Sequence, residues 1–132
     1  MNYKVLIVDD HDVSLLLQQI LWKNKFNIIP DQARCGEDAI DKAEHQDYDF
    51  IIVDFEMYGM RGDQLVKKLR GMEKYKNTPI IVLSSRIDSD AVDTCMLSGA
   101  DDYLMKPIVE DIYFSRINDL SNLNIVSSTY SA

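Results

Sequence analysis

Five short apolar runs alternate along the chain with longer stretches in which apolar residues recur at helical spacing. The runs are short and most of them contain β-branched residues, so they predict strands. They cover residues 4–8, 28–33, 50–53, 79–83 and 102–105. Strands that alternate with helices predict a parallel sheet with helices on both faces, because right-handed crossover connections place the helices there.

The segments between the runs carry apolar stripes that are typical of amphipathic helices, whose apolar face packs on the core. One stripe is formed by Val13, Leu16, Leu17, Ile20 and Leu21. A shorter stripe is formed by Leu65, Val66 and Leu69, and a less regular one by Ile112, Phe114 and Ile117. These patterns predict helices after the first, third and fifth strands.

One proline and the absence of alternation bear on the order of the strands. Pro30 lies in the second run, and proline cannot donate to a strand ladder, so this run belongs at an edge of the sheet. The first, third and fourth runs lack apolar-polar alternation, as expected of strands that are covered on both faces. An open α/β sandwich with strand order 2-1-3-4-5 satisfies both observations.

The composition is that of one globular domain. The chain has 132 residues, of which 46% are hydrophobic and 27% are charged, a mixture typical of soluble proteins. No apolar run approaches the ~20 residues needed to span a bilayer, and no secretory leader precedes the first strand. We therefore expect a cytoplasmic protein without membrane contact. The net charge of −8 disfavours direct binding to nucleic acid, which demands a basic face.

Two further features bear on the organisation of the chain. Residues 1–120 form the expected domain, and the Ser-rich, uncharged segment 121–132 is interpreted as a flexible tail or the start of a linker. Cys35 and Cys95 lie far apart without a zinc or disulfide motif, so we expect two buried thiols.

Several polar residues follow the strands at one edge of the predicted sheet. In an open parallel sheet, ligands bind outside the carboxyl ends of the strands, where the strand order reverses. For order 2-1-3-4-5 this point lies between the first strand, which ends in Asp9 and Asp10, and the third, which ends in Asp54. The fourth strand ends in Ser84 and the fifth in Lys106. A single Asp after a strand is most often a cap, but this combination favours a functional site.

The three carboxylates predict a cation. Like charges held close together repel strongly unless a positive group neutralises them. Hard oxygen ligands of this type suit Mg²⁺, which binds one or two carboxylates and keeps waters that a phosphate oxygen can replace.

Four segments, taken in order, resemble the receiver domain of two-component response regulators. The segment "VLIVDDHDVSLLLQQIL" is similar to the family's opening strand, acid pair and first helix, and "DFIIVDFEMYGMRGDQLVKKLR" to its phosphoacceptor strand and following loop. The segments "PIIVLSS" and "SGADDYLMKP" are similar to its fourth and fifth strands. The resemblance covers residues 4–120. It implies a flavodoxin-like (βα)5 three-layer sandwich with a five-stranded parallel sheet in order 2-1-3-4-5.

The resemblance also implies a chemistry. Asp54 would be the phosphoacceptor, taking a phosphoryl group from the phosphohistidine of a histidine kinase or a histidine phosphotransfer protein. The side chains of Asp10 and Asp54 would hold Mg²⁺, Asp9 would act through an ordered water, and the backbone carbonyl of Glu56 would supply a further ligand. Phosphoryl transfer consists mostly of positioning and charge neutralisation, so a metal and an ammonium around a carboxylate nucleophile are sufficient.

A conformational switch is the second implication of the resemblance. Ser84 and Lys106 would each contact a phosphoryl oxygen, and the peptide between Lys106 and Pro107 would be cis. Phosphorylation would draw Ser84 and Tyr103 inward, although Tyr103 also fits the description of a half-buried strand aromatic. The fourth helix, fifth strand and fifth helix would then present an output face to a downstream protein or an output domain.

Three positions near the predicted site depart from the family or vary within it. Tyr58 stands where the family often has proline, and it either shapes or covers the pocket or is a tolerated surface aromatic. Glu56 and Arg86 each lie two residues beyond a site residue, so we predict that they pair across the pocket mouth and tune the access of water. We expect His11 to face solvent rather than to bind a metal.

Other functions remain as alternatives. A flavin binder shares the strand order, but "DDHD" in the first loop does not form a phosphate cradle, and a nucleotide hydrolase would need a P-loop that is missing. A metal-dependent phosphatase with a nucleophilic Asp is chemically closer. A receiver-like interaction module that is never phosphorylated is the other alternative. As a receiver, the chain would be no enzyme beyond catalysing its own phosphorylation and dephosphorylation.

Overall fold

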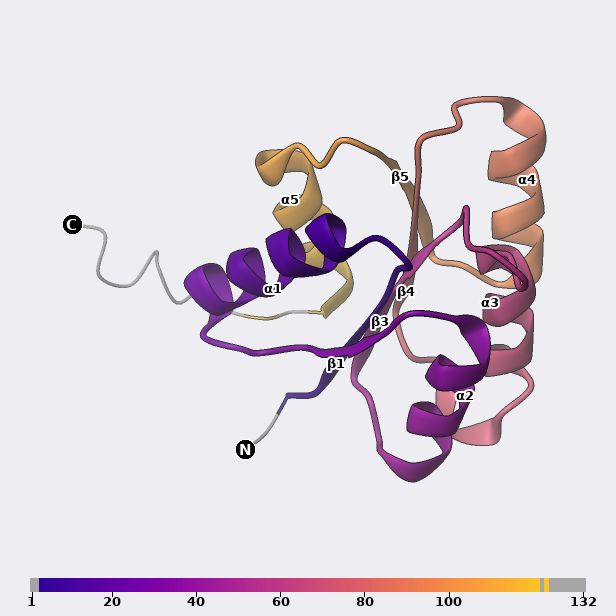
Figure 1. Cartoon of the computed structure of the whole chain (residues 1–132), viewed down its shortest axis with the longest axis horizontal. Coiled ribbons are helices and arrows are strands. Elements are labelled where there is room, and N and C mark those ends of the chain that lie inside the picture. Colours follow the sequence, from indigo (N-terminus) through magenta and orange to yellow (C-terminus); the bar gives the residue numbers. More distant parts are fainter. Residues whose placement is uncertain (1–2, 122, 124–132) are drawn as a thin grey trace.

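The chain folds into a five-stranded sheet with helices on both faces (Figure 1). The computed structural model describes residues 3–121 and residue 123. Its strands are β1 (Val5–Val8), β2 (Asp31–Ala33), β3 (Phe50–Asp54), β4 (Ile80–Ser84) and β5 (Asp102–Met105). They lie in the order β2-β1-β3-β4-β5, and each neighbouring pair is parallel. The predicted flavodoxin-like three-layer fold is confirmed.

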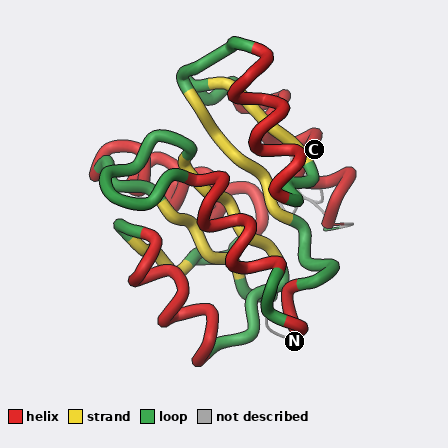
Figure 2. Tube along the Cα trace, turned by 90° about the vertical axis from the view of Figure 1, so that its right-hand side faces the viewer, coloured by secondary structure: helices red, strands yellow, loops and turns green. Residues whose placement is uncertain are grey.

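The helices divide between the two faces of the sheet (Figures 1 and 2). On one face lie α1 (Asp12–Phe26) and α5 (Glu110–Ser121), and on the other lie α2 (Gly36–His45), α3 (Gly62–Arg70) and α4 (Ser89–Ser98). A short 3-10 helix (Glu73–Tyr75) precedes β4. Successive strand residues point to opposite faces, so Ile7 and Ile52 pack toward α1 and α5, whereas Leu6 and Val53 pack on the other side.

The strand boundaries agree with the predicted ones except in β2. The other four strands begin and end within one residue of the prediction. β2 contains only Asp31–Ala33 instead of residues 28–33, and Pro30 lies outside it because a proline nitrogen has no hydrogen to donate. The edge position of β2, which this proline predicted, is confirmed.

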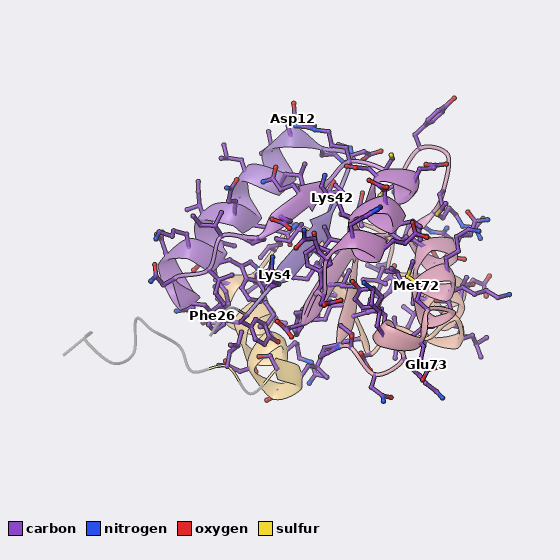
Figure 3. All side chains as sticks on the ribbon, turned by 90° about the horizontal axis from the view of Figure 1, so that it is seen from below. Lys4, Asp12, Phe26, Lys42, Met72 and Glu73 are labelled. Atoms are coloured by element: carbon purple, nitrogen blue, oxygen red, sulfur yellow. The ribbon has the colours of Figure 1, made fainter. Side chains whose placement is uncertain are left out.

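The apolar stripe predicted to pack on the core from the first helix is mostly exposed, so that prediction was wrong. Of its members only Leu21 is buried, and those exposed are Val13, Leu16, Leu17 and Ile20. The buried face of α1, whose ends Asp12 and Phe26 are labelled in Figure 3, instead contains Leu15, Gln18, Trp22 and Phe26.

A buried polar network explains this error. The Tyr113 hydroxyl donates a hydrogen bond to Gln18 Oε1 at 2.7 Å and accepts one from Trp22 Nε1 at 2.9 Å. A buried polar group is tolerated when it is hydrogen-bonded. The side of α1 that carries a glutamine is therefore the side that packs on the sheet, and the more uniformly apolar side is left to solvent.

The remaining core predictions have mixed outcomes. The stripe of Leu65, Val66 and Leu69 is fully buried as predicted. In α5, Phe114 and Ile117 are buried but Ile112 is exposed, and Tyr113 takes its place in the core. Cys95 is a buried free thiol, whereas Cys35 is only partly buried, and its Sγ caps α2 by accepting a hydrogen bond from the Asp38 N–H.

Helix α5 ends at Ser121, one residue beyond the predicted end of the domain. Apart from Ser121 and Leu123, the predicted tail of residues 121–132 lies outside the described residues. Among the helices that the structure describes, none has the length and apolar character needed to cross a bilayer.

Candidate functional site

Asp9 and Asp54 lie side by side because β1 and β3 are neighbours in register. Val8 pairs with Val53, so the residues that follow them leave the sheet at the same level. Their exposed fractions are 0% for Asp9 and 1% for Asp54. Asp10 continues the chain from Asp9 and is partly exposed. The sheet register thus converts two distant sequence positions into one pair of buried carboxylates.

Lys106 contacts both buried carboxylates from the end of β5. Its Nζ lies 2.9 Å from Asp9 Oδ2 and 3.0 Å from Asp54 Oδ1. The backbone N–H of Lys106 donates to the Ser84 carbonyl at 2.8 Å, which holds the lysine at the end of β4. The peptide between Lys106 and Pro107 is cis, as predicted. The structure therefore brings together the acids and the ammonium that the sequence placed at separate strand ends.

Hydrogen bonds keep Asp9 ionised. Burial by itself raises the pKa of the Asp9 carboxyl, but hydrogen bonds from Ser14 and Lys106 and the nearby ammonium outweigh this effect, and the pKa lies below its usual value. Ser14 Oγ donates to Asp9 Oδ2 at 2.5 Å, and the His11 N–H donates to Asp9 Oδ1 at 3.0 Å. Asp9 is thus a fixed negative charge beside Asp54.

Asp54 has the opposite shift. Burial first, and then the charge of Asp9, raise the pKa of the Asp54 carboxyl to about 6, although Lys106 lowers it. Its Oδ2 has no hydrogen-bond donor among the described residues. A buried carboxylate with one oxygen beside an ammonium and the other without a donor is poised to react with, or bind, an electrophilic partner.

Glu56 occupies the donors at the end of β4. The Ser84 hydroxyl donates to Glu56 Oε2, and the Ser85 N–H donates to Glu56 Oε1 at 3.3 Å. Ser84 is fully buried. The Ser84 hydroxyl, which was predicted to bind a phosphoryl oxygen, is therefore hydrogen-bonded to the Glu56 carboxylate in this structure.

Arg86 does not pair with Glu56, so the predicted ion pair across the pocket mouth is wrong. The Arg86 guanidinium instead binds Asp88, with Nε 2.9 Å from Oδ2 and Nη2 3.0 Å from Oδ1, and it lies 5.5 Å from the centre of the Phe55 ring. Asp88 is held beside it as the N-cap of α4, where it accepts from the Ala91 N–H at 2.9 Å. The guanidinium therefore binds a carboxylate that the start of α4 already holds in place.

Tyr103 on β5 is connected to Ser84 through the backbone of Arg86. The Tyr103 hydroxyl donates to the Arg86 carbonyl at 2.7 Å, and the Arg86 N–H donates to Ser84 Oγ at 2.9 Å. The ring is half-buried and packs edge-on against Phe55, with centroids 6.5 Å apart. A displacement of residues 84–86 would therefore move the hydrogen-bond acceptor of Tyr103.

His11 and Tyr58 lie at the rim of the site. Tyr58 is 94% exposed, and its backbone N–H donates to Asp10 Oδ2 at 3.1 Å. The His11 side chain is 66% exposed, as expected, yet its Nδ1 lies 3.0 Å from Asp10 Oδ1 and 3.2 Å from Asp9 Oδ1. Most of the imidazole ring thus faces solvent, while its Nδ1 faces the acid cluster.

The acid cluster has the donor set of a hard divalent cation. Buried oxygens without a hydrogen-bond partner among the described residues include Asp10 Oδ1 and Asp54 Oδ2. Leaving a buried polar atom unpaired is costly, and carboxylate oxygens are the ligands that Mg²⁺ prefers. The residues present therefore fit the predicted ion.

Sequence reasoning missed two supporting residues. Ser14 orients Asp9 from the first turn of α1, and a hydroxyl five residues after the first acid was the available signal. Gly62 begins α3 directly against the end of β3, where a Cβ would lie 2.5 Å from the Asp54 carbonyl oxygen. Its N–H donates to the Phe55 carbonyl at 2.9 Å, so this close approach requires glycine.

A cleft of about 550 Å³ opens over these groups, with Asp54, Glu56 and Lys106 in its lining. Its apolar wall comes from α1, through Val13 and Leu17, and from the segment after β5, through Ile108. Part of the exposed apolar side of α1 therefore borders the polar site.

Comparisons with known proteins agree with this geometry. A family model described as the response regulator receiver domain matches residues 5–118. The chemotaxis protein CheY4 of Vibrio cholerae has a similar solved structure, with a TM-score of 0.85 and 27% sequence identity, covering 91% of this chain and 99% of that one.

Two curated relatives are longer proteins. The sensory/regulatory protein RpfC of Xanthomonas campestris is 32% identical over 123 residues, which cover 91% of this chain and 17% of RpfC. The cell cycle transcriptional regulator CtrA of Caulobacter vibrioides is 32% identical over 114 residues, which cover 86% of this chain and 48% of CtrA. The chain thus spans less than half the length of these two relatives.

Proposed function

The chain belongs to the response regulator receiver family of two-component signal transduction, and we propose that Asp54 is its phosphoacceptor. The observation that carries this assignment is the buried Asp54 carboxylate, with Lys106 3.0 Å from Oδ1 and no hydrogen-bond donor on Oδ2 among the described residues. Asp54 lines the cleft at the carboxyl edge of the sheet, which is where open α/β sheets bind their ligands.

The proposed reaction moves a phosphoryl group from a phosphohistidine to Asp54. A carboxylate oxygen of Asp54 attacks the phosphorus, the phosphorus–nitrogen bond breaks, and its electron pair returns to the imidazole of the donor. The product is an acyl phosphate on Asp54. Lys106 neutralises charge on a phosphoryl oxygen throughout, which is the main requirement of this kind of transfer.

A hard divalent cation is part of the proposal. The side chains of Asp10 and Asp54, Asp9 acting through a water, and the backbone carbonyl of Glu56 would hold Mg²⁺. When bound, the ion supplies positive charge beside the phosphoryl oxygens. Asp9 keeps Lys106 in position through the 2.9 Å contact, so this acid serves both cations.

Ser84 and Tyr103 form the proposed switch. The Ser84 hydroxyl and the Ser85 N–H now bind the Glu56 carboxylate, and the same donors suit a phosphoryl oxygen. Phosphorylation would displace Glu56, draw Ser84 toward Asp54, and pull the Arg86 carbonyl that Tyr103 uses. The face of α4, β5 and α5 would change with it and signal to a downstream protein or an output domain.

The phosphodonor is proposed to be a histidine kinase or a histidine phosphotransfer protein that docks over the cleft. Val13, Leu17 and Ile108 line the cleft with apolar surface, and an exposed apolar patch rimmed by polar groups is typical of an interaction site. A partner of this type acts in the cytoplasm, where we propose that this domain works. We further propose residues 1–120 as the domain.

The two alternative functions are not favoured. Membership of the receiver family fits neither a metal-dependent phosphatase nor a module that is never phosphorylated as well as it fits a phosphoacceptor. The structure also places a buried carboxylate beside an ammonium. A phosphoacceptor needs this arrangement, and an interaction module that is never phosphorylated would not require it.

Intact mass after incubation with acetyl phosphate and Mg²⁺ tests the proposal. We expect the chain to gain one phosphoryl group, and we expect Asp54→Asn or removal of the metal to abolish the gain. Asp12→Asn is the matched control, because Asp12 begins α1 at the same edge but pairs with Arg34 outside the cluster. A gain that survives in Asp54→Asn would contradict the assignment.

A further inference from the structure

Three carboxylates and one imidazole meet at the carboxyl ends of β1 and β3, and the proposed phosphoryl transfer gives the imidazole no task. The ligand atoms of Asp9, Asp10, His11 and Asp54 all lie within 4.8 Å of one another. A histidine beside a magnesium-type site is therefore the unexplained part of the cluster.

The spacing of these atoms matches the ligands of a single small cation. His11 Nδ1 lies 3.0 Å from Asp10 Oδ1, 3.2 Å from Asp9 Oδ1 and 3.9 Å from Asp54 Oδ2. A divalent ion with bonds of about 2.1 Å puts neighbouring ligands about 3.0 Å apart in an octahedron and about 3.4 Å apart in a tetrahedron, and opposite ligands about 4.2 Å apart. Each observed separation falls within this range.

The two sides of the cluster have different charge partners. Lys106 takes one oxygen of each buried acid, Asp9 Oδ2 and Asp54 Oδ1. The other oxygen of each buried acid faces His11 Nδ1, with Asp9 Oδ1 at 3.2 Å and Asp54 Oδ2 at 3.9 Å. Asp54 is 1% exposed, and its Oδ2 has no hydrogen-bond donor among the described residues. A buried oxygen without a donor therefore points into the space that the imidazole nitrogen borders.

We infer that His11 is a nitrogen ligand of this cation site and makes it selective for late first-row transition cations such as Ni²⁺ over Mg²⁺. The inference rests on the proposed cation site. Carboxylate and water ligands suit Mg²⁺, whereas imidazole suits iron, nickel, copper and zinc, and the affinity of a nitrogen ligand rises along the first-row series toward copper. The largely exposed ring of His11 is free to make the small shift that a bond requires.

Calorimetric titration of the untagged chain with Ni²⁺ and Mg²⁺ tests the inference. Since disturbing even the outer partners of a metal ligand costs 10–100-fold in affinity, His11→Ala should weaken Ni²⁺ binding at least about tenfold and change Mg²⁺ binding less than about twofold. His45→Ala is the control. His45 lies beside Asp41 and Glu44 in a group of the same residue types on the exposed surface of α2, and its loss should change neither affinity.

Pulsed electron paramagnetic resonance of bound Mn²⁺ gives a direct signature. Nitrogen coupling should be present in the unmodified chain and in His45→Ala, and absent in His11→Ala. Equal Ni²⁺ affinity in His11→Ala, or no nitrogen coupling in the unmodified chain, would overturn the inference while Mg²⁺-dependent phosphorylation of Asp54 still stood. If no divalent cation binds in a way that depends on Asp10, the cation site itself is overturned, and the ligand role of His11 with it.

Discussion

Two groups of acids with a histidine occur among the residues that the structure describes, and one of the two has the features of a site. Asp9, Asp10, His11 and Asp54 lie at the carboxyl ends of two strands and include two buried carboxylates. Asp41, Glu44 and His45 lie on the outside of α2, the helix that carries the labelled Lys42 in Figure 3, and all three are exposed. Residue type is the same in both, so burial and register make the difference.

The contrast has a simple electrostatic reason. On α2, water screens the charges, and His45 Nδ1 is already within 2.8 Å of the Asp41 backbone carbonyl. At the strand ends, burial removes the water, so each charge depends on its neighbours. The pKa of Asp9 falls and the pKa of Asp54 rises although they are the same residue type in the same sheet. The pKa of a buried aspartate therefore depends on its neighbours, and the two aspartates differ in pKa for this reason.

The largest expected difference is in stability. The pKa of the Asp54 carboxyl is about 6 in the folded chain, against an ordinary value of 3.8. Its ionised form therefore destabilises the folded state increasingly as the pH rises from about 4 to about 6, and by a constant amount at higher pH. Without divalent cations, Asp54→Asn should raise the free energy of unfolding by about 3 kcal/mol at pH about 7.5, and by only about 1 kcal/mol at pH about 4.5. Urea denaturation at the two pH values measures this.

Asp41→Asn is the matched change in the exposed group. It should alter the free energy of unfolding by less than about 0.5 kcal/mol at either pH. A loss of stability in Asp54→Asn at the higher pH would mean that the buried carboxylate is already satisfied, and the contrast between the two groups would be broken.

Removing the Lys106 ammonium gives the next largest effect on stability, and this change lowers the free energy of unfolding. Lys106→Met leaves Asp9 and Asp54 facing each other, and it should cost about 2 kcal/mol at neutral pH, less than a fully buried pair because the lysine retains some exposure. Lys42→Met removes the cation paired with Asp38 on α2 and should cost no more than about 0.5 kcal/mol.

A double-mutant cycle checks the cause. The cost of Lys106→Met should shrink when Asp54→Asn is also present, because one of the two repelling charges is then gone. Equal costs in both backgrounds would show that the lysine acts through packing and not through charge.

The smallest effect concerns the lifetime of the phosphoryl group. Glu56→Ala frees the Ser84 hydroxyl and the Ser85 N–H for a phosphoryl oxygen, worth about 1 kcal/mol, so the phosphorylated form should last about fivefold longer. Glu44→Ala on α2 should leave the lifetime unchanged. The decay of phosphorylated mass after removal of the donor measures it, and an unaltered decay in Glu56→Ala would sink the idea that Glu56 competes for these donors.

Much of the fold and of the site could be predicted from sequence because both depend on strong local signals. The uniformly apolar runs of β1, β3 and β4 mark strands covered on both faces, and Pro30 marks the edge. Once the order β2-β1-β3-β4-β5 is known, parallel strands place Asp9, Asp54, Ser84 and Lys106 at one edge with no knowledge of side-chain packing.

The sequence by itself therefore determined the sheet order and the residues at its carboxyl edge, since these depend on patterning and connection rules. Only the tertiary structure decided which side of α1 is buried, because the Gln18, Trp22 and Tyr113 network satisfies a glutamine inside the core. It alone also decided that Arg86 binds Asp88, that Glu56 binds Ser84, and that His11 turns a nitrogen to the acids. These outcomes depend on angstrom-scale competition among nearby partners, which a linear pattern does not contain.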